Sequence, residues 1–208
     1  IVNQTDFDSY PVTLYVYDQA SNASDCFAAQ SFELIIRSTP IITPLANQEH
    51  CDNYELPQIQ GQHLVNALYY TEPQGQGVSY PANEVFGFAD FVNYPVTLYL
   101  YDETASTPNC FDEQSFELIL HQTPQLDGFA DQEHCDSYTL EEITGTFMNN
   151  PAFYLEPQGQ GDSYDEGHTF DVTDFTQYPV TIYLYDTAPT STGCFNEQSF
   201  ELTLNATP

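Results

Sequence analysis

The most regular feature of the chain is a period of two residues in two short segments, which places large apolar side chains on one face. In segment 96–102, Val96, Leu98 and Leu100 fall on one face, while Thr and Tyr occupy the positions between them. Segment 116–120 alternates in the same way. A period of two residues predicts half-buried β-strands, and β-branched and aromatic residues favour the same structure. Lysine is absent and arginine occurs once, so the usual formers of surface helices are scarce.

These segments belong to a sequence repeat. Counterparts of YPVTLYLYD (94–102) and QSFEL (114–118) occur at 10–18, 30–34, 178–186 and 198–202, so the period, from position 10 to 94 and from 94 to 178, is 84. The constant offset predicts the C-terminal half of a repeat at 1–40 and complete repeats at 41–124 and 125–208. The predicted fold class is all-β, with tandem antiparallel β-sandwich domains.

Each complete repeat is predicted to contain six or seven short strands separated by turn-forming sequences such as ETASTPN. For the repeat 41–124 we expect an edge strand at 41–46 and further strands at 51–59, 66–72, 84–91, 94–102 and 115–121. The strands of the next repeat are expected one period further along the chain. The motif EPQGQG at 72–77 contains glycines and lies between two predicted strands, so it is predicted to be a turn. It lacks the lysine that a phosphate-binding loop would need.

The charge balance excludes several classes of protein. The chain has 31 Asp and Glu against a single Lys or Arg, which gives a formal net charge of −30. Such a chain cannot neutralise phosphates, so we expect neither nucleic acid nor an anionic membrane surface as a partner. A hydrophobic content of 41% argues for a folded chain, and the apolar runs are too short for membrane insertion. Because the chain has neither an initiator Met nor a signal peptide, we expect a piece of a longer protein.

The five cysteines recur at positions set by the repeat period. Cys51 and Cys110 are separated by the same interval as Cys135 and Cys194. The matched spacing predicts one disulfide within each complete repeat. Cys26 would then be unpaired within residues 1–208, and its partner would lie upstream of residue 1. A bond between Cys26 and Cys51 is the alternative. Zinc is disfavoured because closely spaced ligand pairs are missing, and disulfides indicate an oxidising compartment.

The carboxylates have two interpretations. One is a solvated acidic surface, whose self-repulsion keeps a repeat array extended and soluble. The other is calcium binding, because Ca²⁺ takes six to eight oxygen ligands in proteins. The calcium candidates are acidic residues near the ends of the repeats: Glu49, Asp52, Asp102, Glu133, Asp136 and Asp186. The chain lacks a D-x-D-x-D-G loop, so the solvated surface is favoured.

The tyrosines of the alternating strands also have two interpretations. Tyr99, Tyr101, Tyr183 and Tyr185 either form an aromatic ladder on a half-covered sheet face or contact a ligand such as a surface polysaccharide. Architecture must recur in every repeat, whereas a ligand site need not. Recurrence therefore favours the structural role.

The sequence contains no catalytic signature. The motifs G-x-S-x-G and H-E-x-x-H and a Gly-rich phosphate loop are all missing. His63, His121 and His168 do not recur at the repeat offset, which argues against a repeated site that uses them. We therefore expect that the chain is not an enzyme.

The motifs resemble the tandem Ig-like repeats of very large cell-surface proteins of Bacteroidota. The resemblance rests on the order CDNYELPQI, YYTEPQGQG and YPVTLYLYDETASTPNCFDEQSFEL, which covers both complete repeats and the half repeat. Glu141 departs from it, because it stands where the first complete repeat has Pro57. The resemblance implies tandem Ig-like antiparallel β-sandwich domains, with the C-terminal half of an Ig-like repeat at 1–40 and complete Ig-like repeats at 41–124 and 125–208. It also implies filamentous adhesins, including SprB-type gliding-motility adhesins exported by the type IX secretion system, and hence an extracellular location at the cell surface.

The expected function is that of a structural shaft segment in an extracellular bacterial adhesin or surface filament, with gliding motility or surface attachment as the implied role. Neighbouring repeats of the same long chain are the expected partners. One alternative is a polysaccharide-binding module that uses the tyrosine face. Another is a set of accessory domains in a secreted enzyme. Exposure of Tyr99 and Tyr101 separates shaft from binding module, because rings covered by the protein cannot line a ligand groove.

Overall fold

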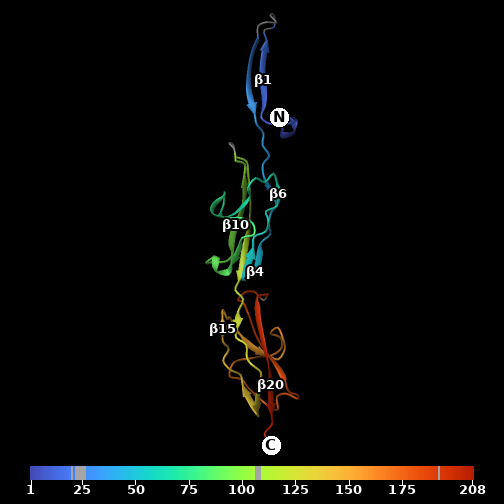
Figure 1. The fold of residues 1–208 in the computed structure, drawn as a ribbon, viewed down its shortest axis with the longest axis vertical. Coiled ribbons are helices and arrows are strands. Elements are labelled where there is room, and N and C mark those ends of the chain that lie inside the picture. Colours follow the sequence, from blue (N-terminus) through green and yellow to red (C-terminus); the bar gives the residue numbers. More distant parts are fainter. Residues whose placement is uncertain (20, 22–26, 106–108, 192) are drawn as a thin grey trace. The chain divides into compact units, whose positions relative to one another are not determined.

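The computed structural model describes residues 1–19, 21, 27–105, 109–191 and 193–208, and it consists almost entirely of β-strands and their connections (Figure 1). The helices in this part of the chain, η1 (Gln4–Asp6) and η2 (Phe88–Asp90), are 3-10 helices of 3 residues each. The all-β class predicted from the period-2 pattern is confirmed. No helix among the described residues has the length and apolar character needed to cross a membrane.

The chain forms two compact units. Unit 1 comprises 1–45, 57–82 and 98–116, and unit 2 comprises 46–56, 83–97 and 117–208. Strands β10 (Val96–Glu103) and β11 (Phe111–His121) contribute to both. The units do not follow the repeat boundaries at residues 40 and 124, so the division into 1–40, 41–124 and 125–208 stays a prediction.

Besides its parts of β10 and β11, unit 1 contains three antiparallel strand pairs: β1 with β2, β3 with β6, and β7 with β8. Their bounds are β1 Val12–Gln19, β2 Phe27–Leu34, β3 Ile41–Ile42, β6 Gly61–Gln62, β7 Leu68–Glu72 and β8 Gln76–Tyr80. Strand β7 also pairs with β10, with Tyr70 opposite Tyr99.

Unit 2 contains the remaining strands. They are β4 Gln48–Cys51, β5 Asn53–Glu55, β9 Val85–Gly87, β12 Gln125–Leu126, β13 Gln132–Cys135, β14 Ser137–Thr139, β15 Gly145–Thr146, β16 Ala152–Tyr154, β17 Ser163–Tyr164, β18 Thr169–Asp171, β19 Val180–Thr187 and β20 Phe195–Asn205.

The strand order of the main sheet defines the fold. The order β4-β11-β10-β7-β8 recurs in the next repeat as β13-β20-β19-β16-β17. In the second sheet β13 runs parallel to β20, whereas the other neighbours are antiparallel. In immunoglobulin nomenclature β11, β10 and β7 of the first sheet, and β20, β19 and β16 of the second, correspond to strands G, F and C. A G-F-C order with one added edge strand on each side is typical of immunoglobulin domains. The smaller pair β14–β18 supplies the other layer.

A tyrosine corner, a further feature of Ig domains, occurs three times. Tyr10 donates a hydrogen bond to the backbone oxygen of Asn3 at 2.8 Å, and Tyr178 donates to that of Asp171 at 3.3 Å. Tyr94 donates to the backbone oxygen of Phe88 at 3.1 Å. A tyrosine that bonds back to the chain just before strand F is characteristic of this fold. The predicted tandem Ig-like β-sandwich architecture is therefore confirmed.

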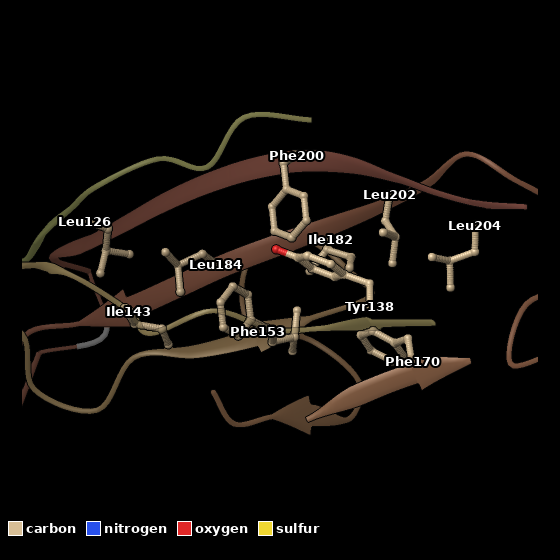
Figure 2. Close-up of a cluster of buried hydrophobic side chains, with 11 residues drawn as sticks. Leu126, Tyr138, Ile143, Phe153, Phe170, Ile182, Leu184, Phe200, Leu202 and Leu204 are labelled. Carbon is tan, nitrogen blue, oxygen red and sulfur yellow. The ribbon is translucent and has the colours of Figure 1, made fainter. Parts of the chain in front are cut away.

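The hydrophobic core of 125–208 lies between these layers. Figure 2 shows Ile182, Leu184 and Phe200 of β19 and β20 facing Tyr138 and Phe170 of β14 and β18. Along β19 every second side chain is buried, as the alternation predicts. Each fully buried aliphatic or aromatic side chain stabilises the fold by about 1.5–3 kcal/mol.

Several predicted strand boundaries were wrong. The strand expected at 51–59 is two short strands, β4 and β5, because Asp52 adopts a left-handed backbone conformation with φ 61° between them. Strand β8 was not predicted, because its first residues belong to the EPQGQG motif. Only part of that motif is the turn: Gly75, with φ 66°, reverses the chain before β8 begins at Gln76.

In the described part of segment 1–40 the strands are β1 and β2, the counterparts of the last two strands of a repeat. Val16 is 60% exposed, whereas its counterpart Leu100 is 2% exposed. Phe32 is 52% exposed, and its counterpart Phe116 is 2% exposed. The same pattern of residues is thus buried only where the other strands of the repeat are present.

Candidate functional site at the junction between repeats

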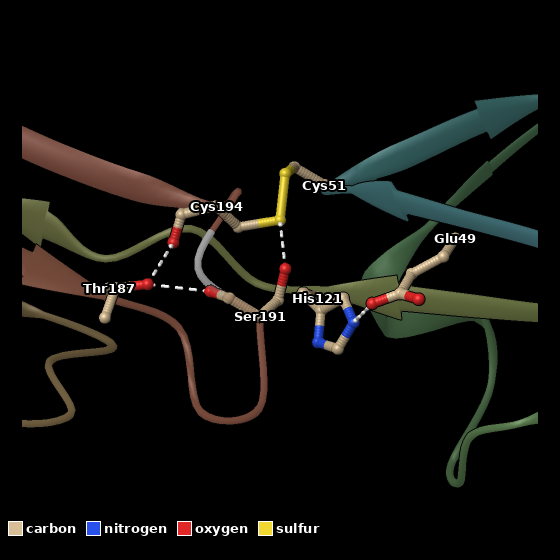
Figure 3. Close-up of polar contacts among 6 residues, drawn as sticks. All are labelled: Glu49, Cys51, His121, Thr187, Ser191 and Cys194. Atoms are coloured by element: carbon tan, nitrogen blue, oxygen red, sulfur yellow. Dashed lines mark hydrogen bonds and ion pairs between the residues drawn. A yellow bond between two sulfur atoms is a disulfide. The ribbon is translucent and has the colours of Figure 1, made fainter.

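A disulfide bond joins the two complete repeats within unit 2. Cys51, the last residue of β4, is bonded to Cys194, which precedes β20 (Figure 3). The two residues are 143 positions apart in the sequence, and their Cα atoms are 5.5 Å apart. The loop that carries Cys194 is fixed by Thr187, whose hydroxyl donates to the backbone oxygen of Ser191 at 2.7 Å. The bonded cysteine at 194 is 3% exposed.

This bond corrects the predicted pairing of Cys51 with Cys110 and of Cys135 with Cys194. The physical reason is the direction of the strands. Strand β13 runs parallel to β20 and places Cys135 opposite Asn205, the last residue of β20, whereas Cys194 precedes its first residue. The 11 residues of β20 cover roughly 36 Å, while a disulfide needs Cα atoms within about 7 Å. The cysteines of one repeat thus lie at opposite ends of its longest strand.

The remaining cysteines are not bonded within the part of the chain that the structure describes. Cys110 is a half-buried thiol and Cys135 an exposed one. Cys26 lies outside the described residues, so the prediction that it is unpaired is not tested.

A cavity of about 300 Å³ adjoins the disulfide. Its lining comes from both repeats: Phe88, Leu120, His121 and Gln122 from the first, and Phe147, Ala188 and Pro189 from the second. His121 Nε2 lies within hydrogen-bond distance of Glu49 Oε1, at 2.8 Å (Figure 3). Glu49, a predicted calcium ligand, is therefore a partner of His121.

An equivalent cavity occurs in unit 1. It has a volume of about 530 Å³ and is lined by Gln4, Ile36, Arg37, Ser38, His63, Val65, Thr104 and Ala105. Seven of these residues lie one period before the seven lining residues of the first cavity, so that Gln4 corresponds to Phe88 and His63 to Phe147. The histidines themselves do not recur, because Phe147 stands at the counterpart of His63 and Arg37 at the counterpart of His121.

The calcium candidates Asp102 and Asp186 are buried and bind the backbone. Each is 1% exposed. The carboxylate of Asp102 accepts the N–H groups of Val65 and Asn66 at 2.6 and 2.8 Å, and that of Asp186 accepts those of Asn149 and Asn150 at 2.7 and 3.0 Å. Their lone pairs already face hydrogen-bond donors, so these carboxylates act as anchors for the segment before strand C of each repeat.

The other candidates are also bound to protein groups. Asp52 accepts hydrogen bonds from the N–H and the hydroxyl of Thr123, and Asp136 does the same with Thr207. Glu133 accepts a bond from the side-chain amide of Asn205. The described residues contain no group of three or more His, Cys, Asp or Glu side chains that could hold a metal ion. The structure thus does not bring the six predicted calcium ligands together.

The tyrosine face is covered by a turn in both complete repeats. Tyr101 forms edge and stacked contacts with Tyr70 and Phe111, and Tyr185 has matching contacts with Tyr154 and Phe195. The EPQGQG turn lies against these rings, because a Cβ added at Gly159 would come within 2.7 Å of Tyr185. The N–H of Gln158 donates to Glu197 of β20, which holds the turn in place. Tyr99 and Tyr183 are half-buried.

Replacing Gly159 with Ala is expected to destabilise the chain more than replacing Gly167. Both glycines have positive φ angles, 64° and 82°, and this backbone strain costs about 1–3 kcal/mol for another residue. Gly167 has nothing within 4 Å of its added Cβ, whereas Gly159 would meet the ring of Tyr185. Urea unfolding measures the difference. Equal losses in G159A and G167A would contradict the close packing of the turn on the ring.

Two tyrosines of the folded chain should lose their hydroxyl protons at a higher pH than tyrosine in an unfolded chain. Burial and the hydrogen bond to Glu103 raise the pKa of Tyr101 to about 12, and burial, with Glu141 nearby, raises that of Tyr138 to about 12. In the unfolded chain tyrosine ionises near pH 10. The unfolded state therefore loses these protons first, and the stability they contribute below pH 10 falls as the pH rises from 10 to 12. Absorbance at 295 nm should show a late phase that shrinks in Y101F; a single step near pH 10 would contradict it.

Comparisons with known proteins give only distant structural similarity. No protein-family model and no curated protein matches the chain. A structure of three titin Ig domains is 13% identical, with a TM-score of 0.41 over 94% of this chain and 75% of that one. The N-terminal four Ig domains of Dscam1 isoform 6.9 are 11% identical, with a TM-score of 0.35 over 86% of this chain. The chain spans 51% of that structure, about half its length. Domains EC21–23 of human CDH23 are 14% identical, with a TM-score of 0.33 over 86% and 69% of the two chains.

Proposed function

We propose that this chain is a structural shaft segment of an extracellular bacterial adhesin or surface filament. The observation that carries the proposal is the covalent bond between successive repeats, Cys51 to Cys194. A bond across a junction fixes one repeat to the next, which is useful where tandem domains hold a distal part of a protein away from a surface. The net charge of −30 adds self-repulsion, which opposes the collapse of an array.

The same bond supports the proposal of an extracellular location, because disulfides persist in oxidising compartments. The resemblance of the CDNYELPQI and EPQGQG motifs to Bacteroidota surface repeats supports the finer proposal of a cell-surface adhesin of the SprB type, exported by the type IX system and used in gliding motility or attachment. A role in catalysis is not proposed.

Deleting one period, residues 125–208, from the full-length gene tests the shaft role. We expect the surface filament to shorten by one repeat in electron micrographs while binding at its tip persists, because a spacer contributes length and not contact. A matched control replaces the same period with a copy of 41–124. Loss of adhesion in the deletion but not in the replacement, at unchanged surface abundance, would instead indicate that this repeat itself binds.

The binding alternative has its own test on the purified chain. Retention of residues 1–208 on a surface polysaccharide, abolished by Tyr183→Ala with unchanged circular dichroism, would favour a polysaccharide-binding module. Because turns of the chain cover Tyr101 and Tyr185, we expect no retention.

A further inference from the structure

We propose that every junction of this repeat is closed by the same disulfide, so that Cys135 is the bonding position for a copy of the repeat that follows and Cys110 for a copy that precedes. The inference deepens the serial role proposed above and rests on it. It concerns the two thiols that the described structure leaves unbonded.

The sequence interval of the observed bond indicates a rule for the whole array. Cys51 and Cys194 are 143 positions apart, which is the interval of 59 between the cysteines of one repeat plus one period of 84. Such a bond joins the first cysteine of one repeat to the second cysteine of the next. By the same offset, Cys135 is the counterpart of Cys51, and Cys110 is the counterpart of Cys194.

The backbone around Cys135 is built as it is around the bonded Cys51. Cys51 lies opposite His121 at the end of β11, and Cys135 lies opposite Asn205 at the end of β20. The next residue, Asp52 or Asp136, has a positive φ of 61° or 63° in the two repeats. Its N–H donates to residue 121 or 205, at 2.8 or 3.0 Å.

The same Asp also fixes the chain just beyond the strand. Its carboxylate binds Thr123 in the first repeat and Thr207 in the second, through both the N–H and the hydroxyl of the threonine. These contacts occur whether or not the neighbouring thiol is bonded. The exposed thiol of Cys135 is therefore held on a preformed surface that matches the bonded side of the observed junction.

The backbone around Cys110 also matches that around its bonded counterpart, Cys194. The backbone oxygen of Cys194 accepts the N–H of Ala188 at 2.8 Å, and that of Cys110 accepts the N–H of Thr104 at 2.9 Å. Thr104 and Ala105 line the unit 1 cavity together with Ile36 and Arg37, the counterparts of Leu120 and His121. The end of the repeat that carries Cys110 thus lines one cavity with residues of 1–40, at the positions that line the cavity of the bonded junction. By the period, the bonding partner of Cys110 is the first cysteine of the preceding repeat.

Each bond forms by oxidation of two thiols. The thiols release two protons and two electrons, and a disulfide oxidant such as oxidised glutathione takes up both to become two thiols. The chemistry matches that of the bond already present between Cys51 and Cys194.

An extended chain tests the proposal. A copy of residues 41–84 placed ahead of Ile1 completes the first repeat, because Ile1 is the counterpart of Val85, and a copy of 125–208 is added after Pro208. The protein is folded in a glutathione redox pair, treated with iodoacetamide, cleaved after Glu and mapped by mass spectrometry without reduction. We expect Cys135 bonded to the second cysteine of the added repeat, and Cys110 bonded to the cysteine of the added N-terminal segment.

Alkylation of Cys135 or Cys110 in the extended chain, with Cys51–Cys194 intact, would overturn the proposal. Cys26 and the first cysteine of the added repeat are alkylated in every variant of the extended chain, and in the matched variant Cys135→Ser the second cysteine of the added repeat should be alkylated as well. The unextended chain supplies a second measurement, in which Cys51–Cys110 or Cys135–Cys194 bonds would overturn the proposal as well. Because the mapping reports connectivity in purified protein, its result is independent of the deletion experiment that tests the shaft role.

Discussion

We expect the chain, pulled from its two ends, to extend by roughly 500 Å less when Cys51 and Cys194 are bonded than when they are reduced. The bond spans 143 residues, and an extended chain covers at most about 3.3–3.6 Å per residue. Under load, force passes directly from Cys51 to Cys194, so the residues between them carry no tension even after their strands separate. The pairing predicted from the sequence, one bond within each repeat, would instead keep two separate and much shorter segments from extending.

Single-molecule force spectroscopy with handles at residues 1 and 208 measures the contour length that the disulfide keeps from extending. The variant Cys51→Ser should reach the full contour length without reductant. Cys135→Ser is the matched control, because it removes a thiol of the same sequence context that is not bonded. Equal contour lengths for C51S and the oxidised natural chain would contradict the bond.

The second large effect is expected from Asp186→Ala, which should lower the free energy of unfolding by about 3–5 kcal/mol. The carboxylate binds the N–H groups of Asn149 and Asn150 in a site where Asp186 is 1% exposed. Its removal takes the acceptor from these two N–H groups and from that of Thr187, and a donor left unsatisfied away from water costs about 1–3 kcal/mol. Domains of this size are stable by only about 5–15 kcal/mol, so the loss is a large share of the total.

Urea unfolding of the purified chain checks this expectation. Asp18→Ala is the matched control, since Asp18 is the counterpart of Asp186 in segment 1–40 but is exposed. A change within about 0.5 kcal/mol is typical for such a surface position. Asp186→Asn should fall between the two, because it keeps one acceptor and adds a donor that faces other donors. Equal stability of D186A and D18A would contradict an anchoring role.

The strands could be predicted because their information is local. In Val96, Leu98 and Leu100 the alternation itself determines which side chains face the core, and burial of Leu98 and Leu100 agrees with it. Strand β8 could not be predicted in this way, because its first residues are glutamine and glycine and its position depends on the turn at Gly75.

The cysteine pairing could not be predicted, because the repeat is compatible with two arrangements. A bond within each repeat and a bond between successive repeats both preserve the period of 84. The deciding fact is that β13 runs parallel to β20, which separates Cys135 from Cys194 by the length of a strand. Strand direction is not encoded in the spacing of cysteines. Likewise, Asp102 and Asp186 were predicted as ligands because acidic residues gather near the ends of the repeats, whereas both carboxylates are buried and accept hydrogen bonds from backbone N–H groups.

The long interval between Cys51 and Cys194 also bears on how the chain withstands proteases. Exposed loops and turns are the usual sites of cleavage. A cut anywhere between the two cysteines leaves both fragments in one covalent molecule, because the disulfide still joins them. The bonded interval of 143 residues exceeds the period of 84, so in an array closed at every junction the intervals overlap and each peptide bond lies inside at least one. No single cleavage would then sever such an array.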